Sequence, residues 1–493
     1  MDFKSLLNNK YILLDGAMGT MLQEAGLEAG GIPELLNLTD PELIESIHKK
    51  YIAAGSNIVY ANTFGANRYK LKGNSVEEII SAGISIAKKA CGEKALTALD
   101  IGPIGQLLEP TGTLTFEEAY SIFKEQIIAG KDADIIVFET MTDLYELKAA
   151  VLAARENSDK PILCTMTFEE NMRTFTGCSI SSMALTLNGL GVDAMGINCS
   201  LGPKQLAPVC EELMKWTNVP VILKPNAGLP DPVTNKYDVL PEDFAEQMKT
   251  AALYGVSIFG GCCGTTPEYI SKLKSVLEKT DIKREKIIIP AAVCSSSNTV
   301  IINQPRIIGE RINPTGKKLF KEALRKHDIG YILNQAIEQT HAGADILDVN
   351  VGLPEIDEKE MMVSAVKAIQ GITDAPLQID STIPEVLEAA LRIYNGKPIV
   401  NSVNGEEKSL ETVLPLVKKY GASVVGLTLD QNGIPPKAED RFKIAEKILS
   451  RALEYGIPRE DVYIDCLTLT ASAEQEAVME TLKALKRVKD ELG

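Results

Sequence analysis

Eight short runs of apolar and β-branched residues, each followed by a segment of helical period, fill the first 280 residues of this 493-residue chain. Such runs indicate buried strands, and the longer segments between them are typical of amphipathic helices. The eight predicted strands are Tyr11–Asp15, Asn57–Asn62, Ala95–Ile101, Ile135–Glu139, Ile162–Thr167, Ala194–Cys199, Val221–Pro225 and Ser257–Gly261. This alternation predicts an α/β fold, a (β/α)8 barrel of the TIM type, with its chemistry at the carboxyl ends of the strands.

A second alternation begins after a break in this rhythm. Its six predicted strands are Ile307–Ile312, Ile346–Val349, Leu377–Asp380, Ile399–Val403, Val424–Leu429 and Val462–Asp465. We therefore predict two barrels in tandem: residues 1–280, a linker over 281–305, and a second barrel over 306–493 that is truncated after its sixth strand–helix unit. A barrel without two of its strands exposes two sheet edges, which indicates a fragment of a longer protein. An open six-stranded sheet is the alternative.

Charge and hydropathy limit the partners of the chain. Its net charge of -16 repels phosphate backbones and anionic lipid, so neither nucleic acid nor a membrane surface is an expected partner. No apolar segment approaches the roughly 18 residues of a spanning helix, and the N-terminus lacks a signal-peptide pattern. These features predict a cytoplasmic protein.

Two adjacent cysteines, Cys262 and Cys263, follow the eighth predicted strand inside a Gly-Gly-Cys-Cys-Gly run. Neighbouring side chains of a regular strand point to opposite faces, but the flanking glycines permit a bend that turns both sulfurs one way. Cys199 ends the sixth predicted strand, so three sulfurs can meet at one side of the barrel mouth. Three thiolates and one exchangeable position are typical of a catalytic zinc site, in which a substrate sulfur can take the fourth position.

The other readings of these cysteines are incidental burial and a vicinal disulfide. Nine cysteines form an odd, scattered set, which argues against a disulfide framework. Six of them are expected to be inert filler: Cys91, Cys164, Cys178, Cys210, Cys294 and Cys466.

Three motifs of the first barrel resemble the homocysteine S-methyltransferase domain. They are Asp15–Thr20 (DGAMGT), Gly196–Ser200 (GINCS) and Gly260–Thr265 (GGCCGT), and the resemblance covers nearly all of residues 1–280. It implies that Cys199, Cys262 and Cys263 bind zinc and that the sulfur of homocysteine binds the metal.

The same resemblance assigns roles around the metal. It implies that Asp15 and Glu139 engage the amino-acid part of homocysteine, and that the turn containing Gly19 and Thr20 offers N–H groups to its carboxylate. It also implies that Asn226 can occupy the open position of the zinc when substrate is absent. A phosphate-binding turn and structural carboxylates at the barrel rim are the alternatives.

Carboxylates and carboxamides, without cysteine or histidine, end the strands of the second barrel. An Asp can accept two hydrogen bonds from an amino-pyrimidine edge, and an Asn can match a lactam, which together is the edge pattern of a pterin. Asp and Asn also cap helices at such positions. The residues are Glu310, Asn313, Asp348, Asn350, Asp380, Asn401 and Asp465.

As a set these residues resemble the pterin-binding domain of dihydropteroate synthase and of methyltetrahydrofolate corrinoid methyltransferases. The resemblance implies that Asp380, Asn401 and Asp465 hold the pterin, with the other four nearby.

The order of the two barrels resembles the N-terminal part of the cobalamin-dependent methionine synthase family. It implies methyl transfer from 5-methyltetrahydrofolate, through cobalamin, to zinc-bound homocysteine, giving methionine and tetrahydrofolate. The cobalamin would be bound by a missing C-terminal region or by a separate protein. A homocysteine methyltransferase that uses betaine or S-methylmethionine is one alternative, and a non-catalytic module that binds zinc and pterin is another.

Overall fold

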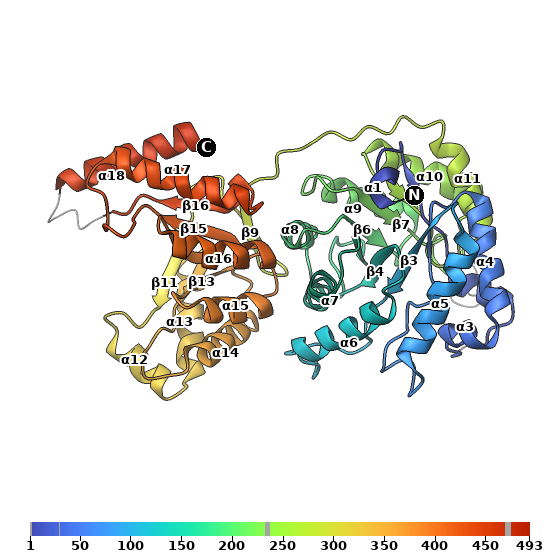
Figure 1. Cartoon of the computed structure of the whole chain (residues 1–493), viewed down its shortest axis with the longest axis horizontal. Coiled ribbons are helices and arrows are strands. Elements are labelled where there is room, and N and C mark those ends of the chain that lie inside the picture. Colours follow the sequence, from blue (N-terminus) through green and yellow to red (C-terminus); the bar gives the residue numbers. More distant parts are fainter. Residues whose placement is uncertain (1, 29, 232–236, 469–474) are drawn as a thin grey trace. The chain divides into compact units, whose positions relative to one another are not determined.

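The chain forms two compact units in a computed structural model that describes residues 2–28, 30–231, 237–468 and 475–493. The units are Met1–Ile289 and Pro290–Gly493. Figure 1 shows strands and helices alternating in both units. Among the described residues, no helix is both long enough and apolar enough to cross a membrane.

The first unit is built on an eight-stranded parallel sheet in the order β1-β8-β7-β6-β5-β4-β3-β2. Asn57 links the two end strands, because its backbone N–H donates to the carbonyl oxygen of Leu13 (2.7 Å) and its Oδ1 accepts from Leu13 N (2.8 Å). The sheet is thus closed into the predicted barrel. Its strands are β1 Ile12–Leu13, β2 Ile58–Tyr60, β3 Leu96–Ile101, β4 Ile135–Met141, β5 Ile162–Met166, β6 Ala194–Asn198, β7 Val221–Lys224 and β8 Ile258–Phe259.

Helices follow the strands around this barrel. Short polar side chains fix several helix starts; Thr115 and Glu118, for example, form a reciprocal capping box at the start of α6. The helices are α1 Phe3–Leu6, α2 Met18–Glu24, α3 Leu36–Thr39, α4 Pro41–Ala54, α5 Val76–Cys91, α6 Phe116–Ala129, α7 Leu144–Asn157, α8 Ile180–Leu190, α9 Pro203–Leu213, α10 Pro241–Leu253 and α11 Pro267–Leu277.

Alternation along the strands places an apolar core inside the barrel. Ile58, Ala98, Val137 and Ile222 come from four different strands and belong to one buried cluster. Successive side chains of a strand point to opposite faces, so the residue two positions further along each strand also faces inward, one layer nearer to the mouth.

The second unit contains a six-stranded parallel sheet in which the strands follow one another in chain order. All six predicted strands are confirmed. They are β11 Ile308–Ile312, β12 Ile346–Val349, β13 Leu377–Asp380, β14 Ile399–Asn404, β15 Ser423–Leu427 and β16 Val462–Asp465. The helices are α12 Lys318–Arg325, α13 Ile329–His341, α14 Glu358–Gln370, α15 Pro384–Ile393, α16 Glu407–Tyr420, α17 Ala438–Glu454 and α18 Gln475–Arg487.

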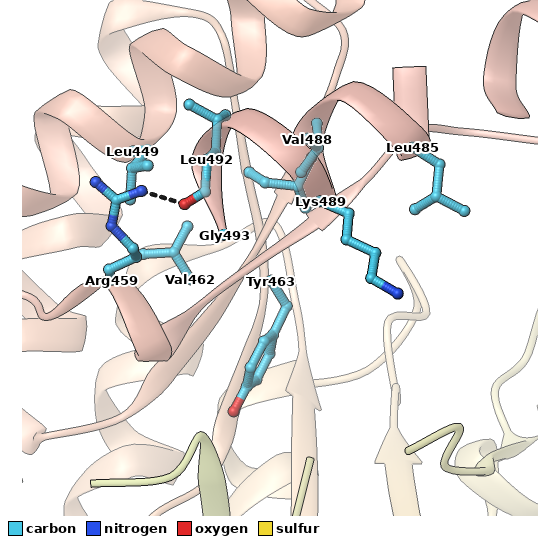
Figure 2. Close-up of a pocket in the computed structure, with 10 residues that line it drawn as sticks. Leu449, Arg459, Val462, Tyr463, Leu485, Val488, Lys489, Leu492 and Gly493 are labelled. Atoms are coloured by element: carbon cyan, nitrogen blue, oxygen red, sulfur yellow. Dashed lines mark hydrogen bonds between the residues drawn. The ribbon is translucent and has the colours of Figure 1, made fainter. Parts of the chain in front are cut away.

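The edge strand β16 borders a cavity of about 290 Å³. Figure 2 shows Val462 and Tyr463 of β16 on one side of it, and Leu485 and Val488 of the last helical segment on the other. The guanidinium of Arg459 donates to the carbonyl oxygen of Leu492, which ties the end of this segment to the start of the strand.

Part of the predicted linker 281–305 forms a hairpin. Its strands, β9 Ala292–Cys294 and β10 Thr299–Ile301, are antiparallel. Val293 and Val300 of the hairpin pack against Ile346 and Ile399, which are the first residues of β12 and β14. The hairpin therefore covers the amino-terminal end of the second sheet, and the boundary between the units lies before it.

His48, on α4, is fully buried, and neither of its ring nitrogens has a hydrogen-bond partner among the described residues. Burial lowers its pKa from 6.5 to about 4. As the pH falls below about 6.5 the unfolded chain binds a proton at this histidine, whereas the folded chain does so only near the lowered pKa. Between pH 8 and pH 5 we expect His48 to remove about 2 kcal/mol from the free energy of unfolding.

His48→Leu should remove this loss. Trp216 is the single tryptophan and lies in the first unit, so its fluorescence in urea reports the unfolding of that unit. The exposed His341, on α13 of the second unit, provides the control variant His341→Leu. The assignment fails if wild type and His48→Leu lose stability in parallel on acidification.

Candidate metal centre and binding sites

The three cysteines meet at the mouth of the first barrel. Their sulfurs all lie within 4.8 Å of one another, and the Sγ atoms of Cys199 and Cys263 are 4.0 Å apart. Tetrahedral zinc with Zn–S bonds of about 2.3 Å places its sulfurs about 3.8 Å apart. The donor set therefore fits zinc in number, spacing and softness.

The backbone holds the cysteines in these positions. Cys199 follows β6 in the left-handed conformation, with φ of 62°, and its N–H donates to the carbonyl oxygen of Lys224 (3.0 Å). Cys262 N donates to Pro225 O (2.8 Å), so both cysteine segments are bonded to the end of β7. At position 261 a Cβ would lie 2.3 Å from Thr265 Oγ1, and that hydroxyl donates to Cys262 O (2.7 Å). Glycine is thus required where the chain bends.

Without a cation the three thiols cannot ionise together. Hydrogen bonds from Cys199, Cys262 and the Tyr237 hydroxyl lower the pKa of Cys263 to about 3. Hydrogen bonding to Cys199 and Cys263, together with burial, raises the pKa of Cys262 well above its usual value. One thiolate is thus stabilised by two thiols and a phenol, and a divalent cation is what would let all three sulfurs be anionic.

A buried charged cluster lies in the same barrel mouth. Lys224 Nζ is 3.0 Å from Glu139 Oε2 and 3.7 Å from Asp15 Oδ1. The backbone N–H of Tyr60 donates to Asp15 Oδ2 (2.8 Å), and the Asp15 Oδ1 atom has no hydrogen-bond partner among the described residues. Burial raises the pKa of Asp15 to about 7, against the opposing effect of Lys224. Asp15 and Glu139, both predicted site residues, are thus brought together.

Sequence reasoning gave no role to Lys224, Tyr60 or Asp100. Each comes two positions after an inward-facing core residue of its strand, and this regular alternation was the signal that could have identified them. Asp100 is 6% exposed. Its burial, and to a smaller extent the charge of the nearby Glu139, raise its pKa well above the usual range.

The remaining predicted residues of the first unit surround the cysteines. Gly19 and Thr20 lie in the first turn of α2, where backbone N–H groups have no partner within the helix. Thr20 Oγ1 accepts a hydrogen bond from Gly264 N (3.0 Å), next to Cys263. Asn226 is 5% exposed, and its Oδ1 has no hydrogen-bond partner among the described residues.

In the second unit the strand ends of β12, β13 and β14 share a polar network. Asp348 Oδ1 accepts hydrogen bonds from Gln378 Nε2 (2.6 Å) and Asn401 Nδ2 (3.4 Å), while its buried Oδ2 has no partner among the described residues. Burial raises the pKa of Asp348 to about 7. Asn350 Nδ2 donates to Asp380 Oδ2 (2.9 Å), and burial raises the pKa of Asp380. Gln378 was missed, although it shares a strand face with Asp380.

The side chains of three other predicted pterin residues contact residues near them in the sequence. Asp465 is exposed, and its Oδ1 accepts from Leu467 N (2.7 Å). Glu310 is exposed and lies 3.7 Å from Lys317 Nζ, and Asn313 Oδ1 accepts from Thr315 N (2.9 Å). Their role in pterin binding stays a prediction.

Two family models match this chain, one in each structural unit. The family model of homocysteine S-methyltransferase matches residues 12–277, and that of pterin binding enzymes matches residues 309–493. The first match lies within the first structural unit and the second within the second unit.

Curated relatives include the methionine synthases of Mycobacterium leprae (strain TN) and Mycobacterium tuberculosis (strain ATCC 25618 / H37Rv). Each is 31% identical to this chain over 99% of its length, and each alignment covers 44% of the relative. The chain thus spans less than half the length of these relatives. Among solved structures, the oxidized form of the homocysteine methyltransferase MmuM from Escherichia coli is 22% identical, with a TM-score of 0.49, over 55% of this chain and 97% of that one. With a family model that matches more than half of its residues, this chain belongs to the homocysteine S-methyltransferase family.

Proposed function

We propose that the first unit methylates the sulfur of homocysteine to give methionine, using a zinc ion held by Cys199, Cys262 and Cys263. The observation that carries this proposal is the meeting of three sulfurs at the mouth of a barrel whose next layer holds buried, incompletely bonded carboxylates. Bound zinc would keep the homocysteine sulfur deprotonated and nucleophilic at neutral pH.

The protein groups beside the sulfurs have complementary tasks. Asp15 and Glu139 would receive the ammonium group of homocysteine, and the N–H groups of the first turn of α2 would receive its carboxylate. Asn226 Oδ1, which has no hydrogen-bond partner in the described part of the chain, could take the open metal position until substrate arrives.

The second unit would supply the methyl group from 5-methyltetrahydrofolate. Asp380, Asn401 and Asp465 would bind the pterin edge, and protonation or hydrogen bonding at N5 is needed because an amine without it is a poor leaving group. Transfer between the units would pass through cobalamin, held by a domain or protein other than these two units. A cytoplasmic location and the absence of nucleic-acid or membrane partners stay predictions from composition.

Zinc-loaded protein supplied with homocysteine should form methionine from methylcobalamin, and not from betaine or S-methylmethionine. Methionine formation is followed by mass spectrometry with a deuterated methyl group on each donor. Turnover with betaine or S-methylmethionine alone would overturn the cobalamin route. X-ray absorption at the zinc edge shows whether the ligands of the zinc change when homocysteine is added. If they do not change, the first unit is a non-catalytic zinc-binding module.

A further inference from the structure

The charged cluster of the first barrel has too few hydrogen-bond donors for its acceptors. Two buried carboxylates, Asp15 and Glu139, pair with the ammonium of Lys224, and the buried carboxyl of Asp100 interacts electrostatically with the same group. One oxygen of Asp15 and one of Asp100 are buried without a hydrogen-bond partner among the described residues. Buried polar atoms without a partner are costly, so these two oxygens call for a further hydrogen-bond donor.

Lys224 occupies a fixed place within this cluster. Its side chain is 3% exposed, and its ammonium lies 3.6 Å from the centre of the Tyr60 ring, a cation–π contact, as well as beside Glu139. A Cβ at position 260 would come within 3.0 Å of Lys224 Cγ, so glycine at the end of β8 gives room to the lysine stem. The ammonium of Lys224, on β7, thereby contacts side chains of β2 and β4.

We propose that Lys224 is a positioning residue for substrate recognition: it fixes Glu139 and Asp15 so that their remaining oxygens receive the ammonium of an amino-acid thiol. The inference rests on the proposed function of the first unit and adds a basis for selectivity. Homocysteine brings three N–H donors and a positive charge to Glu139 and to the unpaired Oδ1 of Asp15, whereas a thiol without an amino group leaves the Asp15 oxygen unpaired.

Two thiols and one substitution test this role. Homocysteine and 4-mercaptobutanoate, which is homocysteine without its amino group, are titrated calorimetrically into zinc-loaded protein. Lys224→Gln should weaken homocysteine binding by about 10- to 100-fold, the usual effect of a lost charged hydrogen bond, because Glu139 is no longer held. The affinity for 4-mercaptobutanoate should change by less than about threefold.

Lys397→Gln is the matched control. Lys397 is also buried and ion-paired, with its Nζ 2.5 Å from Asp461 Oδ1, but it lies in the second unit. It should lower stability without changing the affinity for homocysteine. If Lys224→Gln does not fold, Glu139→Gln is compared with Glu139→Gln/Lys224→Gln. The double variant does not leave the charge of Glu139 buried without its partner. Because Lys224 acts mainly through Glu139, the double variant should bind homocysteine within about threefold of Glu139→Gln.

The outcomes separate the inference from the function on which it rests. A wild type that binds neither thiol overturns the proposed function and the inference with it. The positioning role alone is overturned if the wild type binds homocysteine and Lys224→Gln binds it equally well. It is also overturned if Lys224→Gln loses affinity for homocysteine and for 4-mercaptobutanoate by the same factor. A double variant that binds homocysteine more than about threefold more weakly than Glu139→Gln has the same meaning.

Discussion

Cys262→Ser is expected to remove zinc from the first unit and to abolish methylation of homocysteine. The serine hydroxyl is a harder donor and far less acidic than the thiol, and it replaces one of the three proposed sulfur ligands. Partners outside the ligand shell already change metal affinity about 10- to 100-fold, so loss of a ligand should cost at least about 100-fold. Metal content after dialysis, measured by mass spectrometry, should fall from one zinc per chain to near zero.

The substitution also tests which cysteines matter. Cys210 is fully buried on α9 and is absent from the sulfur cluster, so Cys210→Ser controls for the loss of any buried thiol. It should keep its zinc even where it lowers stability. If Cys262→Ser retains full zinc and full homocysteine methylation, the three sulfurs are not the metal site.

The sequence predicted the strands well because most of them are buried parallel strands with a continuous apolar run, although β11 is largely exposed. β12, β13 and β16 begin and end where they were predicted, and the two-residue β1 and β8 lie inside longer predictions. Parallel strands bring their carboxyl ends to one edge, so the convergence of Cys199, Cys262 and Cys263 followed from topology alone.

Features that depend on contacts distant in sequence were not predictable in this way. The β9–β10 hairpin is short, and what holds it is the apolar surface of Ile346 and Ile399. The sequence around Lys224 gives no sign of a functional role, because its partner Glu139 lies 85 residues earlier and only the folded barrel brings the two together. Gln378 likewise gains a role only through Asp348 on the neighbouring strand. The local sequence pattern determines which side chains a strand directs to each face. The tertiary packing determines which residues those side chains contact.

Asp380→Asn is expected to remove most pterin binding from the second unit. Asp380 ends β13, and its Oδ2 is held by Asn350 Nδ2 at 2.9 Å. An ionised carboxylate can accept two hydrogen bonds from the amino-pyrimidine edge of a pterin, whereas an amide presents one oxygen and an N–H₂ group that would face another donor. Losing a charged hydrogen bond and gaining a donor–donor clash should weaken 5-methyltetrahydrofolate binding by about 100-fold or more.

Asp374→Asn separates this effect from a general change of charge. Asp374 is exposed and precedes the same strand at its opposite end, so its replacement removes the same charge away from the polar network. Calorimetric titration with 5-methyltetrahydrofolate should give wild-type affinity for Asp374→Asn and little heat for Asp380→Asn. Because the cysteines lie in the other unit, both variants should keep zinc and homocysteine binding. Equal affinities in the three proteins would place the pterin elsewhere than at the carboxyl end of β13.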